Sequence, residues 1–178
     1  HFREILDDKK GDDEKSTPDW IVELVKSTGG MFGIRTGPEA MKSYGKVPND
    51  CAGSTKSFAQ AYEYGDQKLG VAMGFGSDLN GFIQQIRPRF GNSNETCGAA
   101  KTKGEKRRQQ AAQRNPLGST FDRSGFGHIG QITEIVQELR NFGVDTSNLD
   151  RSADSFVRMW GRAERWAPEA RTRGLASE

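Results

Sequence analysis

The fold is decided by residues 69–81, which read LGVAMGFGSDLNG. The run Leu69–Phe75 is short, apolar and bounded by glycines, a pattern typical of a strand buried on both faces. It leads directly into residues 77–81, whose small and polar side chains favour a turn. The sequence therefore predicts a buried strand that ends in a polar loop carrying Asp78.

A helix and a first strand are expected upstream. Ser16-Thr17-Pro18-Asp19 can start a helix, because a hydroxyl can cap its first turn and proline fits that turn. Gly29-Gly30 can end it, since glycine permits the left-handed conformation found after many helices. Met31–Ile34 follows as a short apolar run, which predicts a buried strand ending in the loop 35–54.

A second helix is expected between the two strands, from a cap at Ser54 or Thr55 to a terminator at Gly65. Helix, strand, helix, strand is the order of parallel βα units, in which helices cover the sheet. Parallel strands are usually buried on both faces, and two of them cannot make a stable sheet alone. The pattern therefore requires neighbouring strands that this chain does not contain.

The rest of the chain is less regular. Residues 82–127 lose periodicity and predict a long excursion on the surface, within which 101–114 could form a short exposed helix. An amphipathic helix closed by Gly143 is expected next, with an apolar face made by Ile129, Ile132, Ile135, Val136 and Leu139. A further helix is expected after a Ser152 cap, burying Ala153, Phe156, Val157 and Trp160. The polar tail after Pro168 predicts a frayed end.

Composition supports an incomplete core. Hydrophobic residues make up 33% of the 178 residues, and 22 residues are glycine, a thin apolar supply for a self-sufficient domain. The chain begins at His1 without a methionine, so a start in mid-sequence is expected. No apolar run approaches the about 18 residues that span a bilayer, which predicts no transmembrane segment.

Charge gives no support for a nucleic-acid partner. The formal net charge is +2, and the one basic cluster, residues 101–108, lacks the interleaved aromatic side chains that stack on bases. A solvated loop is the better interpretation of that cluster. The two cysteines, Cys51 and Cys97, match no zinc pattern, and a disulfide and two free thiols remain equally open.

The order of elements and several motifs resemble the membrane-dipeptidase branch of the amidohydrolase superfamily. Residues 26–34, KSTGGMFGI, resemble the approach to the seventh strand of that family's TIM barrel and the strand itself. Residues 71–81, VAMGFGSDLNG, resemble its eighth strand, where the family shows a Gly-Ser-Asp-Phe-Asp-Gly pattern. Residues 129–143 and 156–158 resemble its terminal helices. The implied fold class is α/β, with the whole of 1–178 forming the C-terminal portion of a single TIM (β/α)8 barrel domain.

The resemblance implies a function for Asp78. TIM-barrel enzymes carry their chemistry at the C-terminal ends of the strands, where Asp78 is expected. In the family this carboxylate holds the metal-bound water and exchanges its proton during amide hydrolysis, helped by a metal that lowers the pKa of water from about 15.7 to about 7. The alternative is a turn-forming aspartate ahead of the Asn-Gly pair at residues 80 and 81.

The metal site implied by the resemblance is incomplete in this sequence. Zinc, one ion or two, would need histidines and carboxylates from earlier strands, but the chain has no HxD motif and only His1 and His128. His1 is the one candidate ligand, as a remnant of the sixth-strand region, and the others would lie outside the chain. His128 is better interpreted as a structural histidine near a helix start.

Other residues could complete the mouth of the barrel. Arg35 directly follows the first strand and could pair with the carboxylate of a small peptide or amide substrate through its fork of donors; a plain surface arginine is the alternative. Asn80 extends from the same loop as Asp78 and could also contact substrate. A disulfide between Cys51 and Cys97 would tie together the loops after the two strands and suit an exported enzyme, periplasmic or extracellular.

The sequence thus predicts a zinc-dependent peptidase or amidohydrolase, of which this chain alone would be inactive. Its partner would be the missing N-terminal portion of the same barrel. The alternative is a non-catalytic binding module that kept barrel pieces and lost the metal site.

Overall fold

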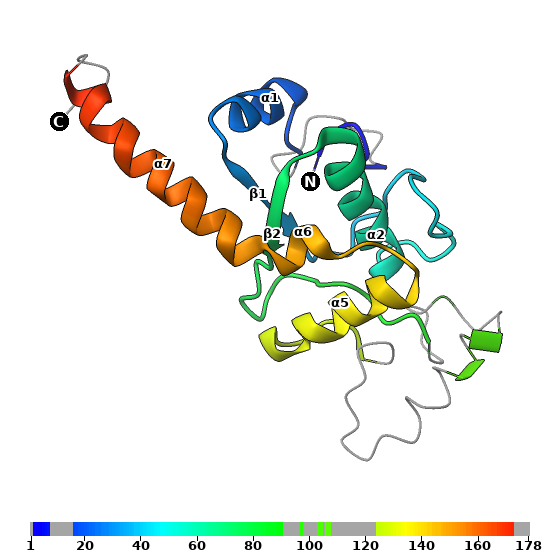
Figure 1. Cartoon of the computed structure of the whole chain (residues 1–178). Helices are drawn as coiled ribbons and strands as arrows, with labels where there is room; N and C mark the ends of the chain where they lie inside the picture. Colours follow the sequence, from blue (N-terminus) through cyan, green and yellow to red (C-terminus); the bar gives the residue numbers. More distant parts are fainter. Residues whose placement is uncertain are drawn as a thin grey trace.

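The computed structural model contains a small parallel sheet surrounded by helices (Figure 1). It describes residues 2–7, 16–90, 97, 103–104, 106–107 and 124–172, with the side chains of the last helix described through Trp166. The sheet pairs β1 (Met31–Arg35) with β2 (Ala72–Gly76) in parallel, with Met31 opposite Ala72 and Arg35 opposite Gly76. The expected parallel strand pair is therefore confirmed.

Helix α1 (Asp19–Ser27) leads into β1. The expected hydroxyl cap is wrong: the N-cap position is Pro18, and no side chain caps the helix. Asp19 lies in the first turn, where its charge opposes the helix dipole. The helix ends as expected at Gly29, whose φ of 68° lies in the left-handed region that glycine adopts without strain.

Helix α2 (Thr55–Glu63) connects the two strands and begins as predicted, with the Ser54 side chain accepting a hydrogen bond from the Lys56 amide. The predicted end at Gly65 is wrong, because the chain continues as the π-helix η1 (Tyr64–Leu69) to Gly70, which has φ 63°. A Cβ on Gly65 would lie 2.5 Å from the Met73 sulfur, so this glycine permits close packing and does not end the helix. The wide turn delays β2 to residue 72.

One face of the sheet packs on α2, all nine residues of which are buried. The Phe58 ring stacks on Phe75 of β2, with 5.8 Å between centroids. The buried Gln60 side chain of α2 is satisfied by the surrounding loop: it accepts from the Tyr44 amide at 2.5 Å and donates to the Val47 carbonyl at 2.8 Å. A helix buried on all sides in this way fixes the sheet relative to the surrounding loops.

Helix α5 (Ile132–Asn141) follows a short 3-10 turn, η2 (Ile129–Gln131), and packs on α2. Ile135 and Leu139 are fully buried, but Ile129 lies on the exposed 3-10 turn and is not part of the predicted apolar face. Gly143 closes the helix as expected, with φ 80°. The short helix α6 (Ser147–Asp150) follows and carries Asn148. The Asn148 side chain accepts a hydrogen bond from the Met73 amide and donates one to the Val71 carbonyl, at the start of β2.

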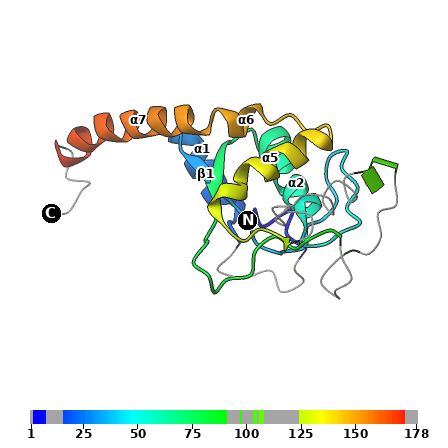
Figure 2. The same ribbon diagram turned by 90° about the horizontal axis from the view of Figure 1, so that it is seen from below.

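Helix α7 (Ser152–Thr172) starts beside β2 and then projects away from the body, as both views show (Figures 1 and 2). The predicted burial of Ala153, Phe156, Val157 and Trp160 is wrong, because all four are exposed. The helix runs on to Thr172, so the fraying predicted after Pro168 is wrong for residues 169–172, and the rest of that tail lies outside the described residues. Arg162 of α7 donates a hydrogen bond to the carbonyl of Gly29, in the turn before β1.

The region 82–127 returns to the core in the parts that the structure describes. Ile86, Phe90 and Phe126 are buried, and Arg89 pairs with Glu138 of α5 while its guanidinium lies over the Phe90 and Phe142 rings. Of the basic cluster 101–108, only four residues are described, and all four are exposed. Within the described residues, no helix is both long and apolar enough to cross a bilayer.

Candidate functional site

The candidate site lies where the two parallel strands end. Arg35 is the last residue of β1 and lies opposite Gly76, the last residue of β2, so the residues that follow both strands come together at one edge of the sheet. Asp78 follows two residues later with φ 49°, and among the described residues it is the only non-glycine with positive φ. Aspartate tolerates this left-handed conformation better than most residues, although a strained backbone is also a common feature of functional sites.

Arg35 is held by a carboxylate that the sequence did not indicate. Its Nη1 lies 2.7 Å from Glu39 Oε1, and both side chains are only 15% exposed. Its Nε lies 3.6 Å from Asp78 Oδ2, which is too long for a hydrogen bond but close enough for charge attraction. The Asp78 side chain is 61% exposed, so it faces solvent on its other side.

The Glu39 carboxylate folds over a glycine. A Cβ on Gly37 would lie 2.1 Å from Glu39 Oε2 and 2.8 Å from its Cδ, so any side chain at residue 37 would displace the carboxylate. No positive φ is recorded for Gly37, and the backbone itself would accept alanine. The glycine therefore provides the space in which Glu39 reaches Arg35.

A second set of polar contacts joins the ends of the strands from the other side. The Thr36 hydroxyl, which is fully buried, lies 3.1 Å from the Ser77 carbonyl and 2.6 Å from Gln85 Oε1. The Ile86 amide donates to the Thr36 carbonyl at 2.7 Å. These bonds fix the loop after β2 against the end of β1, and with it the position of Asp78.

Asn80 shapes the same loop. Its Oδ1 accepts hydrogen bonds from the amides of Phe82 at 3.0 Å and Ile83 at 3.2 Å, a local turn that asparagine favours. The turn leaves the Phe82 ring almost completely exposed. Of the three predicted site residues that the structure describes, Arg35 and Asp78 are brought together, and Asn80 bonds the backbone of its own loop.

The described side chains do not fit a zinc site. No group of three histidine, cysteine, aspartate or glutamate side chains comes together in the part of the chain that the structure describes. The two carboxylates at the strand ends have the Arg35 guanidinium between them, and its positive charge disfavours a cation there. His1, the predicted ligand, lies outside the described residues. His128 is the N-cap of η2, and its amide donates to Gln131 Oε1 at 3.2 Å.

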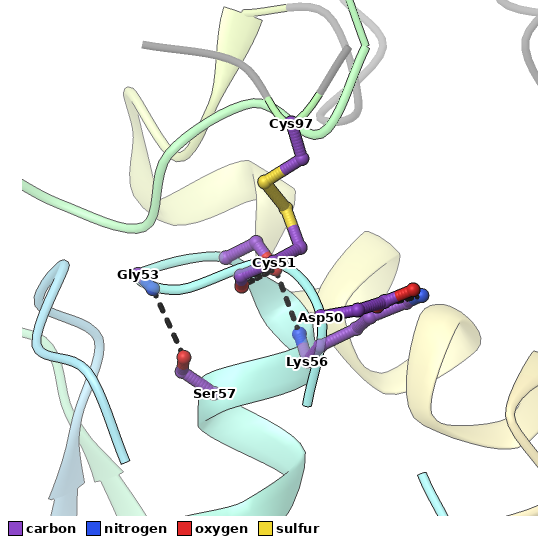
Figure 3. The surroundings of a disulfide bond; sticks show 7 residues. Asp50, Cys51, Gly53, Lys56, Ser57 and Cys97 are labelled. Carbon is purple, nitrogen blue, oxygen red and sulfur yellow. Dashed lines mark hydrogen bonds and ion pairs between the residues drawn. A yellow bond between two sulfur atoms is a disulfide. The ribbon is translucent and has the colours of Figure 1, made fainter. Parts of the chain in front are cut away.

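The disulfide is formed. Cys51, which is buried just ahead of α2, is bonded to Cys97 with a Cα–Cα distance of 5.5 Å (Figure 3). Around Cys51 the chain is held by the Gly53 amide, which donates to the Ser57 hydroxyl, and by the Lys56 ammonium, 2.6 Å from Asp50 (Figure 3). The loop after β1 is thus attached covalently to the region after β2.

No known protein family, curated protein or solved structure matches the chain. Glu39 and Thr36 are the members of the site that sequence reasoning missed. They lie in or beside loops, where no helical or strand period signals which side chains meet. Only the placement of Glu39 four residues after a strand-end arginine hinted at an ion pair, and that spacing has meaning mainly in helices.

Proposed function

We propose that the chain is part of a metal-dependent hydrolase of the dipeptidase or amidohydrolase type that acts on a peptide or amide bond. In this proposal β1 and β2 are the seventh and eighth strands of a TIM barrel, and the loops after them form part of the active-site mouth. The observation that carries it is Asp78, an accessible carboxylate at the C-terminal end of a parallel strand pair and 3.6 Å from a cationic side chain.

Asp78 would act as the general base and then the general acid. As water attacks the carbonyl carbon of the substrate, Asp78 accepts a proton from that water. It then returns the proton to the leaving nitrogen as the carbon–nitrogen bond breaks, so that the carboxylate is regenerated. Its 61% exposure leaves room for water and substrate. Zinc would take its ligands from polypeptide outside this chain, and substrate contacts by Arg35 and Asn80 remain predictions.

The incomplete sheet supports a partner that supplies more strands. Among the described residues β1 and β2 pair only with each other, yet parallel sheets are normally covered and extended on both sides. Large apolar side chains are exposed on α1 and α7, the helices next to β1: Trp20, Leu24, Phe156, Val157, Trp160 and Trp166. Additional βα units beside β1 would cover them, as the N-terminal portion of the same barrel would.

The disulfide bears on location. Disulfides persist in oxidising surroundings and are rare where thiols are kept reduced. A bond between Cys51 and Cys97 is therefore compatible with an exported protein, periplasmic or extracellular. We include export in the proposal on this basis.

The test is an assay of dipeptide hydrolysis in the presence of zinc, with the barrel that the proposal requires. It compares the wild-type protein with the Asp78→Asn variant. Asparagine accepts the left-handed backbone of residue 78 as readily as aspartate, so the substitution removes the proton acceptor and keeps the loop. We expect activity to fall about 10²- to 10⁴-fold.

The matched control is Asp154→Asn on α7, which breaks an exposed ion pair with Arg158 and should leave activity unchanged. Full activity in Asp78→Asn would refute the role of Asp78. A folded natural protein with no hydrolytic activity and no metal ligands would favour the non-catalytic binding module.

A further inference from the structure

The contacts of Arg35 define a role for Glu39. Arg35 lies between two carboxylates and is closer to one of them than to the other. Glu39 is within hydrogen-bonding distance at 2.7 Å and equally buried, whereas Asp78 is 3.6 Å away and mostly exposed. The Arg35 Nε facing Asp78 is buried and has no hydrogen-bond partner among the described residues. The position of the guanidinium is therefore set by Glu39 and not by Asp78.

We propose that Glu39 is a positioning residue that fixes Arg35 beside Asp78. In this arrangement Asp78 has a positive charge next to it but makes no hydrogen bond with Arg35. The inference rests on the proposed function, because it assigns Glu39 and Arg35 to the action of Asp78.

An unbonded but charge-stabilised carboxylate suits proton exchange. A carboxylate bonded to arginine has to break a charge-assisted hydrogen bond before it can turn toward another partner. Asp78 has no such bond to break, because Glu39 holds the Arg35 guanidinium through Nη1. Charge attraction at 3.6 Å still acts between Arg35 and Asp78, and it is strengthened by the burial of Arg35. Glu39 thus acts on Asp78 through Arg35.

Two substitutions disturb Glu39 in different ways. Glu39→Gln removes its charge and keeps its shape. Gly37→Ala keeps the charge but places a Cβ where the Glu39 carboxylate now lies, 2.1 Å from Oε2. If position as well as charge matters, both variants release Arg35. Glu23→Gln is the matched control, because it makes the same chemical change in an exposed pair with Lys26 on α1.

The first readout is nuclear magnetic resonance of the Arg35 Nε–H group in the longer natural protein, which requires no enzymatic activity. We expect slow hydrogen exchange of this buried group in the wild type and in Glu23→Gln, and faster exchange in Glu39→Gln and Gly37→Ala. Asp78→Asn should leave the exchange rate nearly unchanged. Faster exchange in Asp78→Asn, or no effect of Glu39→Gln, would overturn the assignment of Glu39 as the anchor.

The second readout is a double-mutant cycle on dipeptide hydrolysis. Glu39→Gln alone should lower kcat about tenfold, because the guanidinium beside Asp78 loses the ion pair that holds it in place, with little change in KM. In the Asp78→Asn background Glu39→Gln should have no further effect on kcat, because the carboxylate on which Glu39 acts through Arg35 is already lost. An equal loss of kcat in both backgrounds would show a merely structural role and refute the proposal.

The two readouts keep this inference separate from the proposed function. If the wild-type protein hydrolyses nothing, the proposed function fails, and the exchange rates still decide whether Glu39 anchors Arg35. If Asp78→Asn abolishes activity but Glu39→Gln does not reduce it, the proposed function stands and the positioning role of Glu39 is refuted.

Discussion

Glu63 is a carboxyl group buried at the end of α2. A Cβ on Gly45 would lie 2.2 Å from its Oε2, so the carboxylate packs directly under the Gly45 turn. Gln67 donates to Oε1 at 3.3 Å, and Oε2 has no hydrogen-bond partner among the described residues. Desolvation by burial raises the pKa of Glu63, because the surroundings disfavour the charged form more than they stabilise it.

This burial makes stability depend on pH. With the pKa of Glu63 higher in the folded than in the unfolded state, its contribution to the free energy of unfolding is fully present below the unfolded pKa and is lost as pH rises through the folded pKa. Glutamine at residue 63 carries no charge at any pH, so the Glu63→Gln variant should not lose stability as pH rises. At neutral pH its free energy of unfolding should be about 1 kcal/mol higher than that of the wild type. Urea unfolding across the acidic and neutral range measures it. An identical pH slope in both proteins would contradict the expectation.

Single residues were predictable where the chain itself positions them. Asp78 and Arg35 follow apolar runs, and the ends of parallel strands meet, so their proximity could be expected from the sequence. The partner of Arg35 could not, because Glu39 reaches it only through the space left by Gly37. Packing of this kind depends on loop geometry that no periodic pattern encodes.

The disulfide stabilises the elements between its two cysteines. Replacing both Cys51 and Cys97 by serine should lower the free energy of unfolding by about 2–4 kcal/mol, because the unfolded chain regains the freedom of the 46-residue separation. Thermal and denaturant unfolding measure the loss. A reducing agent should destabilise the wild type by a similar amount and leave the double variant unchanged. Equal stability of wild type and variant would show that the bond is incidental.

Elements were predictable in type more often than in their ends. The apolar periods placed both strands and the helices α1, α2, α5 and α7, but not the short helix α6, and Ser54 marked the start of α2. Gly65 was misleading because it lacks a side chain in order to pack closely against Met73, and not in order to end a helix. The helix continues past it as the wider turn η1 and ends at Gly70. The frayed end predicted after Pro168 was also placed too early, because α7 runs on to Thr172.

The whole molecule exposes all of its tryptophans. Trp20 on α1 is 68% exposed, and Trp160 and Trp166 on α7 are 54% and 61% exposed. In the 178-residue chain alone, acrylamide should therefore quench all three indoles. In a longer protein that supplies strands next to β1, we expect shifted emission and weaker quenching, because these side chains become buried.

Single-tryptophan variants would show which helix is covered. Protection of Trp20 and Trp160 together would support added βα units beside β1. If the tryptophans of the longer protein are quenched as strongly as those of the chain alone, α1 and α7 face solvent in both, and the barrel proposal loses its support.

The burial of the last helix was the main error at this scale. The low apolar content and the two lone strands predict missing neighbours, and this stays a prediction. The same reasoning assumed that every apolar helical face is covered by this chain, which is why the burial of Phe156 and Trp160 was predicted wrongly. A periodic pattern indicates which face is apolar, not which polypeptide covers it.

The bond between Cys51 and Cys97 closes a covalent ring that contains α2, η1 and β2. A protease that cuts the backbone once inside this ring releases no fragment, and the nicked chain migrates as one species until a thiol is added. The ring therefore keeps β2, and the loop after it that carries Asp78, attached to the covering helix α2 even after such damage.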